Sequence, residues 1–316
     1  KPIRIVGHLD ADGLSSTAIL IKAFKRKDIK FSVSIVKQLD QNILEELNKE
    51  EYKTIFFVDL GSGQLENIDI ILKEKNIFIL DHHNPGLIKE NNISHINPHL
   101  FGIDGAKEIS GAGVVYLFCK ILDEKNKDLA YLAIIGAIGD IQEFKGFLGL
   151  NNEILKDAVE TGKLEVKKGL RMFGMQTKPI HKVLEYSTDP YIPNITGNEE
   201  GALNLLREIG IEPKENGKWK KLINLDEEDM KKLVTAIILK RLGSEEKPED
   251  VLGQIYLLKE EEEENPTKDA REFSTLLNAC GRLKKPSLGI GTCLGNKNVK
   301  EKAIELLINY KREIIA

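Results

Sequence analysis

Residues 76–86 read NIFILDHHNPG, and this stretch decides the fold class. Its first five residues form a largely apolar run with the length and composition of a buried strand. Asp81, His82 and His83 follow at the carboxyl end of that strand, and Asn-Pro-Gly then turns the chain. In open α/β sheets, ligands bind at this edge. We therefore expect these three side chains to face a ligand site.

Three further acidic segments follow apolar runs in the same way. Ile3–Val6 leads into His8-Leu9-Asp10-Ala11-Asp12-Gly13, Thr54–Val58 leads into Asp59, and Leu132–Gly139 ends at Asp140. Carboxylates and imidazoles from several such ends would form a cage of oxygen and nitrogen ligands suited to Mn²⁺ or Mg²⁺. No cysteine lies near these segments in the sequence, which argues against zinc held by thiolates.

Each of these residues also has a simpler structural explanation. An aspartate after a strand often caps a helix, and for Asp59 alone this explains the residue as well as a ligand role does. Asp140 could simply end a helix, although a carboxylate there opposes the helix dipole and requires a nearby cation. We interpret His95, His99 and His181 as surface or hydrogen-bonded histidines.

Taken together, the motifs His8-x-Asp10-x-Asp12-Gly13, Asp59, Asp81-His82-His83 and Asp140 resemble the four motifs of the DHH phosphoesterases in order and separation. That resemblance implies two divalent ions, usually Mn²⁺, with Mg²⁺ as an alternative. It assigns His8, Asp10 and Asp59 to the first ion, and Asp12, Asp59, His82 and Asp140 to the second, so that Asp59 bridges them. It further implies that Asp81 orients a histidine and that His83 contacts the phosphate or protonates the leaving group.

Strand-like and helix-like runs alternate over residues 1–140, which predicts an α/β fold with a parallel sheet covered by helices on both faces. Residues 151–186 are predicted to be helical, with a basic run that forms a solvated face or part of a strand-binding groove. Residues 187–198 break both periodicities and are interpreted as a linker, before helices at 199–209 and 225–242.

The C-terminal part is predicted to be a smaller α/β unit, with strands at 251–258 and 287–294 and helices at 269–283 and 299–315. It resembles the DHH-associated domain of archaeal RecJ-like exonucleases. The expected division is therefore a DHH catalytic domain at 1–186, a linker with connecting helices at 187–248, and a substrate-binding domain at 249–316, with a cleft between the catalytic and substrate-binding domains. Many relatives carry a Gly-Gly-His element here, and Asn278–Arg282 stands in its place.

Substrate contacts are expected at two places. Ser110 and Gly111 open a helix, where backbone N–H groups can bind an anion, although close helix packing explains the small residues equally well. Gly281 and Arg282 form the second candidate, because arginine suits bidentate contact with a phosphate.

Composition limits the remaining possibilities. A length of 316 residues is typical of two domains, and a net charge of −4 does not indicate a nucleic-acid binder, so a local basic surface and metal ions would have to hold any nucleic acid. Cys119, Cys280 and Cys293 are widely spaced without a CxxC motif, which predicts reduced cysteines and a cytoplasmic protein. Because the sequence begins two residues before a strand, we expect further residues to precede Lys1.

The resemblance implies a metal-dependent, single-strand-specific exonuclease that releases mononucleotides from DNA, RNA or both, with replication proteins as partners. One alternative is a small-molecule phosphoesterase of the same superfamily, such as an oligoribonuclease or a nucleotide phosphatase. The other is a replication scaffold without enzymatic activity. Such scaffolds tend to lose metal ligands, whereas every expected ligand is present in this sequence.

Overall fold

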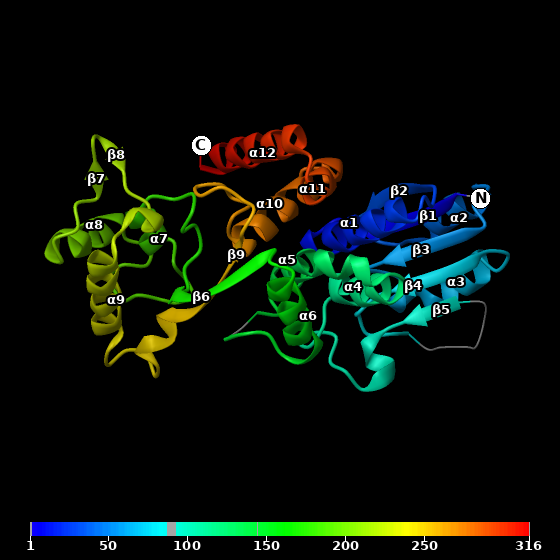
Figure 1. The fold of residues 1–316 in the computed structure, drawn as a ribbon, viewed down its shortest axis with the longest axis horizontal. Helices are drawn as coiled ribbons and strands as arrows, with labels where there is room; N and C mark the ends of the chain where they lie inside the picture. The colour runs from blue at the N-terminus through cyan, green and yellow to red at the C-terminus, as the bar shows by residue number, and fades with distance from the viewer. Residues whose placement is uncertain (1, 87–92, 144, 316) are drawn as a thin grey trace. The chain divides into compact units, whose positions relative to one another are not determined.

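The computed structural model describes residues 2–86, 93–143 and 145–315, with side chains as far as residue 309 (Figure 1). The chain divides into two compact units. The first comprises Lys1–Leu164 and Phe273–Ala316, and the second comprises Glu165–Glu272. Among the described residues, no helix is both long and apolar enough to cross a membrane.

A five-stranded parallel sheet in the order β2-β1-β3-β4-β5 forms the centre of the first unit. Its strands are β1 (Ile3–His8), β2 (Phe31–Val36), β3 (Thr54–Val58), β4 (Asn76–Leu80) and β5 (Ile93–Ile96). Val58 pairs with Leu80, so β3 and β4 end side by side. The acidic residues that follow these strands therefore emerge at one edge of the sheet, as the sequence predicts.

Helices cover both faces of this sheet, which confirms the predicted fold class (Figure 1). Side chains of α2 (Gln41–Lys49) and α3 (Leu65–Ile71) share a buried core with alternate residues of β3 and β4, including Phe57 and Ile79. On the opposite face, Phe56 contacts the rings of Phe24 in α1 (Ala11–Arg26) and Phe118 in α4 (Gly111–Leu122). The buried helix α5 (Ala130–Gly139) packs against α1 and α4, and α6 (Gly149–Glu160) packs against α5.

The C-terminal helices α10 (Ala270–Arg282), α11 (Pro286–Cys293) and α12 (Lys297–Ile315) belong to the first unit from Phe273 onward. The strand predicted at 287–294 is wrong, because most of this segment forms α11. Pro286 occupies the first helical turn, where its missing N–H costs no hydrogen bond. Gly289 of α11 packs against Leu14 of α1, since a Cβ at Gly289 would lie 2.8 Å from Leu14 Cδ1.

The second unit consists of short elements around its own buried core. These elements are β6 (Leu164–Leu170), α7 (Ile180–Glu185), α8 (Glu199–Glu208), β7 (Lys214–Glu215), β8 (Lys218–Trp219), α9 (Glu227–Arg241) and β9 (Leu252–Leu258). The prediction of helices over 151–186 is therefore wrong over β6. Ile192 and Ile195, within the expected linker, are buried in the core of this unit. The two compact units thus follow different boundaries from the domains expected from the sequence.

Candidate metal centre

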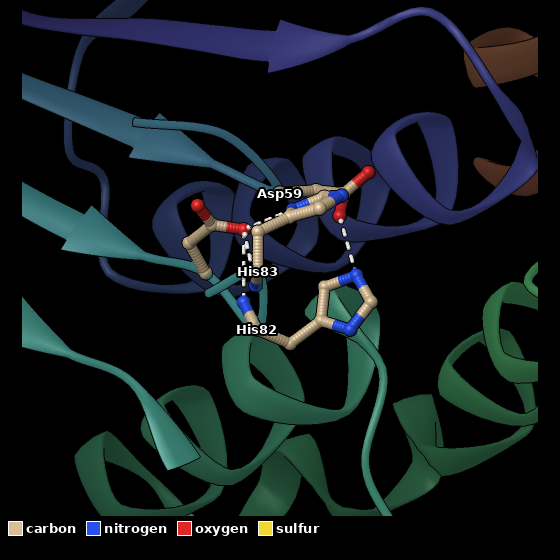
Figure 2. Close-up of side chains that lie close together, drawn as sticks. Asp59, His82 and His83 are labelled. Atoms are coloured by element: carbon tan, nitrogen blue, oxygen red, sulfur yellow. Dashed lines mark hydrogen bonds and ion pairs between the residues drawn. The ribbon is translucent and has the colours of Figure 1, made fainter. Parts of the chain in front are cut away.

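Asp59 lies at the centre of the candidate site. It follows β3 directly and has a left-handed backbone with a φ of 60°, while its N–H donates to the Leu80 carbonyl at 2.9 Å. The residue is 1% exposed, and neither of its carboxylate oxygens has a hydrogen-bond partner among the described residues. Oδ2 lies 3.7 Å from Nδ1 of His8. Oδ1 lies 3.3 Å from Nε2 of His82, the contact drawn in Figure 2. The carboxylate therefore faces two different imidazoles.

His8, Asp10 and Asp59 form the first ligand group, with one potential ligand atom from each lying within 4.8 Å of the others. His8 ends β1, and its Nδ1 lies 2.8 Å from Oδ2 of Asp10. Asp10 caps α1, because its Oδ1 accepts the N–H of Gly13 at 2.9 Å. That cap fixes one carboxylate oxygen and leaves the other facing His8.

Asp12, His82 and Asp140 form the second group. Nε2 of His82 lies 3.1 Å from Asp140 Oδ2 and 3.7 Å from Asp12 Oδ2. The buried Asp12 carboxylate accepts the N–H groups of Gly111 at 2.6 Å and Ala112 at 3.0 Å, both at the start of α4. The helix dipole of α4 therefore favours the ionised form of Asp12.

Two glycines allow the helices to approach these carboxylates closely. A Cβ at Gly111 of α4 would collide with Oδ1 of Asp59, and a Cβ at Gly136 of α5 would collide with Oδ1 of Asp12. The sequence offered a substrate contact or close helix packing for Gly111 and gave no sign of Gly136. Both positions make room for the acidic cluster.

The orientation of His82 depends on two residues that the sequence analysis missed. His82 Nδ1 lies 2.6 Å from the Gly105 carbonyl, so it carries the proton and leaves Nε2 as the potential ligand atom. The buried Gln142 donates from Nε2 to the same carbonyl at 2.9 Å and accepts from Asn151 at 2.6 Å. Neither residue belongs to a recognisable motif, and only the proximity of Gln142 to Asp140 in the sequence could have pointed to it.

Asp81 and His83 form a hydrogen-bonded pair, and potential ligand atoms of both lie within 4.8 Å of those of Asp59 and His82. Asp81 Oδ1 lies 2.7 Å from His83 Nδ1, and Oδ2 accepts the N–H of Ser62 at 2.9 Å. Asp81 is fully buried, whereas the His83 side chain is 55% exposed. Burial raises the pKa of Asp81, but the hydrogen bond from His83 and the charge of that imidazole outweigh burial. The net effect holds the pKa of Asp81 well below its usual range. Asp81 therefore holds the His83 imidazole in place through Nδ1, while about half of that side chain stays exposed to solvent.

The loop that carries His83 is fixed from β5. Asn97 donates from Nδ2 to the His83 carbonyl and to Ser62 Oγ, both at 2.8 Å. Ser62 Oγ lies 2.9 Å from Nε2 of His95, so this histidine is hydrogen-bonded, as the sequence analysis expected.

The electrostatics of the cluster favour added positive charge. Burial lowers the pKa of His8, but the Asp10 and Asp59 carboxylates raise it more strongly, to about 10. Burial raises the pKa of Asp12 well above its usual range, and Asp59 and Asp140 raise it further. The buried Asp59 oxygens and His82 Nε2 lack hydrogen-bond partners among the described residues, and their oxygen and nitrogen chemistry matches that of divalent-metal ligands. These residues thus fit divalent cations.

The four predicted substrate residues all lie in the first unit, and Gly111 contacts the acidic cluster through its backbone. Ser110 is buried and caps α4 by accepting the Gly113 N–H at 3.2 Å, and Gly111 donates its N–H to Asp12. The anion at this helix N-terminus is therefore the Asp12 carboxylate, which corrects the expectation that these N–H groups meet a substrate phosphate. Gly281 packs directly on the Leu9 carbonyl, while Arg282 is exposed.

Helix α10 also contacts the first motif through Asn278, whose Oδ1 accepts the Ala11 N–H at 2.9 Å. Asn278 and Gly281 therefore hold the loop between His8 and Asp12. A pocket of about 250 Å³ borders His8, Asp59, Asp81 and His83, with Lys37 and Gln64 also in its lining.

Comparison with known proteins gives matches over both compact units. The family model "DHH family, N-terminal domain" matches residues 2–137, and the "DHH-CID domain" model matches residues 172–253. The uncharacterized protein MJ0831 of Methanocaldococcus jannaschii is 38% identical over 320 residues, which cover 99% of this chain and 68% of that protein.

The single-stranded-DNA-specific exonuclease RecJ of Thermus thermophilus is 26% identical over 221 residues, or 65% of this chain and 32% of RecJ. The structure of T. thermophilus RecJ in complex with Mn²⁺ aligns over 99% of this chain and 36% of that chain, with a TM-score of 0.53 and 18% identity. CDC45 from Entamoeba histolytica aligns over 97% of this chain and 70% of that chain, with a TM-score of 0.67 and 16% identity. The chain thus spans about a third of RecJ, and the likeness to the two structures shows a shared fold. On the MJ0831 and family-model matches, together with the motif geometry, the chain belongs to the DHH family.

Proposed function

We propose that this chain is a metal-dependent phosphodiesterase that removes mononucleotides from single-stranded DNA, RNA or both. The position of Asp59 carries the proposal, because its two carboxylate oxygens face His8 and His82 at 3.7 and 3.3 Å. A carboxylate placed between two ligand groups is suited to bridge a pair of cations.

The ligand sets follow two of the three groups of potential ligand atoms that the described residues form. His8, Asp10 and Asp59 would hold one ion, and Asp12, Asp59, His82 and Asp140 would hold the other. We propose Mn²⁺ as the resident ion, with Mg²⁺ as the alternative. When bound, such ions supply Lewis-acid activation of water and neutralise charge on the phosphate.

The proposed role of His83 is to donate a proton to the leaving oxygen. Its exposed imidazole is held through Nδ1 by Asp81 at 2.7 Å, which leaves Nε2 as the atom that can reach a substrate. The hydrogen bond to Asp81 raises the pKa of His83, so the protonated form persists to higher pH. Asp81 is proposed to act through His83, because its two oxygens already accept hydrogen bonds.

Single strands are the proposed substrate because the curated relative T. thermophilus RecJ is named a single-stranded-DNA-specific exonuclease. The family resemblance also supports replication proteins as partners. A scaffold without enzymatic activity is disfavoured, since six side chains with metal-ligand chemistry converge at this site.

Digestion of DNA and RNA single strands labelled at either end, in Mn²⁺, Mg²⁺ or EDTA, tests the proposal. We expect mononucleotide release with a divalent ion only, and loss of nearly all release in Asp59→Ala because the bridging ligand is gone. Glu66→Ala, which removes an exposed carboxylate from α3, is the matched control and should behave as wild type. Near-wild-type release by a folded, metal-reloaded Asp59→Ala protein would exclude this site.

Substrate length separates the exonuclease from a small-molecule phosphoesterase. An exonuclease holds several phosphates of a strand, so its catalytic efficiency should rise with length over several nucleotides and then level off. If dinucleotides are cleaved as efficiently as ten-nucleotide strands, the small-molecule alternative replaces the exonuclease.

A further inference from the structure

Ile141 has an unusual backbone beside the metal centre. It follows Asp140 directly, has a φ of 58°, and is 83% exposed. Several other non-glycine residues among those described have a positive φ, and all of them are Asp, Asn, Lys or Glu. A β-branched residue in the left-handed region is a steric outlier, so the isoleucine at this position requires an explanation.

The backbone conformation itself has a clear structural role. Ile141 N–H donates to Ile138 O at 3.1 Å and Gln142 N–H donates to Ala137 O at 2.9 Å, which is the hydrogen bonding of a helix end that turns through a left-handed residue. This turn leaves Asp140 Oδ2 3.1 Å from His82 Nε2 and places Gln142 in its buried contact with Gly105. Glycine is the usual residue at such a position.

The side chain of Ile141, in contrast, contributes little to the fold. It is one of the most exposed large apolar side chains among the described residues, second to Ile121 at 87%. Glycine would form the same turn without strain, and a polar residue would be better hydrated. The position thus combines local strain with an exposed apolar group, one residue from a proposed metal ligand.

We propose that the Ile141 side chain is a substrate contact that packs against the base of the nucleotide whose phosphate lies at the metal centre. This inference rests on the proposed function. Adjacent Cα atoms are about 3.8 Å apart, so Ile141 is anchored within reach of a nucleotide held beside Asp140. An aliphatic contact with the face of a base gains from the removal of apolar surface from water and does not depend on which base is present. It would favour nucleotides over simple phosphodiesters without selecting a sequence.

The test compares Ile141→Gly with Ile141→Leu and with Ile121→Ala, which removes an exposed isoleucine from α4. For each we would measure the melting temperature, the binding of a fluorescent single strand in EDTA, and the ratio of catalytic efficiencies on that strand and on bis(p-nitrophenyl) phosphate, a diester without a base.

We expect Ile141→Gly to melt no lower than wild type, because strain is relieved. We also expect it to bind the strand about 5-fold more weakly and to lower the efficiency ratio about as much, since an apolar contact is lost. Ile141→Leu and Ile121→Ala should keep the wild-type binding and ratio.

Unchanged strand binding and an unchanged ratio in Ile141→Gly would overturn the contact, whatever its melting temperature. A weakened binding that Ile121→Ala shares would also overturn it, because the effect would then be unspecific. If the wild type binds the strand but cleaves neither substrate, the proposed hydrolysis fails and the binding comparison alone decides the contact. If the wild type does not bind the strand in EDTA, the ratio of catalytic efficiencies alone decides the contact, and if it also cleaves neither substrate, both proposals fail.

Discussion

Both compact units bury carboxyl groups, but these groups have different surroundings. In the second unit, Glu272 accepts hydrogen bonds from the Gln176 N–H and the Thr177 hydroxyl, and Asp269 accepts the Arg271 N–H at 2.7 Å. In the first unit, neither oxygen of Asp59 has a hydrogen-bond partner among the described residues, and Oδ1 lies 3.3 Å from His82 Nε2.

The difference shows that burial of an acid does not by itself indicate a metal site. Asp269 and Asp59 are both almost inaccessible, and burial raises the pKa of each. Buried polar atoms without hydrogen-bond partners are rare, because each costs free energy. Several such atoms that converge on imidazole nitrogens therefore indicate a site suited to a cation. Satisfied acids such as Glu272 have a structural role instead.

The largest expected difference between Asp59 and Asp269 is in the response to metal. Wild-type protein should be stabilised by Mn²⁺ by about 4 kcal/mol at a thousandfold excess over the dissociation constant. Asp59→Ala should lose most of this stabilisation, whereas Asp269→Asn should retain it. Thermal unfolding with and without Mn²⁺ measures both. In EDTA at neutral pH, Asp59→Ala should be at least as stable as wild type, because ionisation of this buried acid with a raised pKa opposes folding. An equal loss of the Mn²⁺ response in both variants would contradict the distinction.

The second expected effect is on turnover. His83→Ala should lower kcat by about 10²-fold or more, the range for removal of a general acid, and elemental analysis should still find the wild-type number of ions. Because the hydrogen bond to Asp81 raises the pKa of His83, kcat should fall as pH rises through that pKa. Asp81→Asn should therefore move this alkaline limb to lower pH. If elemental analysis finds fewer ions in His83→Ala than in wild type, His83 is a metal ligand instead.

The sequence predicted residues 1–140 better than the remainder, because the determinants of that part are local. Apolar runs such as Thr54–Val58 form strands that end at aspartates, and parallel pairing then brings Asp59 and Asp81 to one edge. The segment 287–294 has strand-like residues, yet packing of Gly289 against Leu14 and the start at Pro286 stabilise a helix. That contact joins residues far apart in the chain, so no local pattern contains it.

The same limit applies to the site. The motif residues were recognisable, and the structure brings the six proposed ligands together. The residues that orient them were missed, because Gly105 acts through its backbone carbonyl and Asn278 reaches Ala11 from α10. Residue type does not reveal such contacts.

A smaller effect is expected from the buried acid of the second unit. Burial raises the pKa of Asp269 to about 6, with a further contribution from Glu272. The folded state therefore holds the proton more tightly than the unfolded state, and stability is lost as pH rises from about 4 to about 6. Asp269→Asn should be about 1–3 kcal/mol more stable than wild type at pH 8, and the difference should shrink near pH 4. Denaturant unfolding across this range is the measurement, and a constant difference at all pH values would contradict the assigned cause.

The smallest expected effect compares one exposed arginine from each unit. Arg282 is exposed at the end of α10, one residue after the glycine that packs on Leu9, whereas Arg207 is exposed on α8 of the second unit. If strands are held beside the metal centre, Arg282→Ala should weaken binding of a single strand several-fold. It should also flatten the slope of log affinity against log salt concentration by about 0.7, the value for one lost phosphate contact. Arg207→Ala should change neither quantity, and the net charge of −4 gives no diffuse positive field that could produce the effect. Fluorescence anisotropy titrations over a range of salt concentrations measure the slope. Equal salt slopes for the two variants would show that Arg282 does not contact the strand. A flattened slope in Arg207→Ala alone would show that the strand binds the second unit.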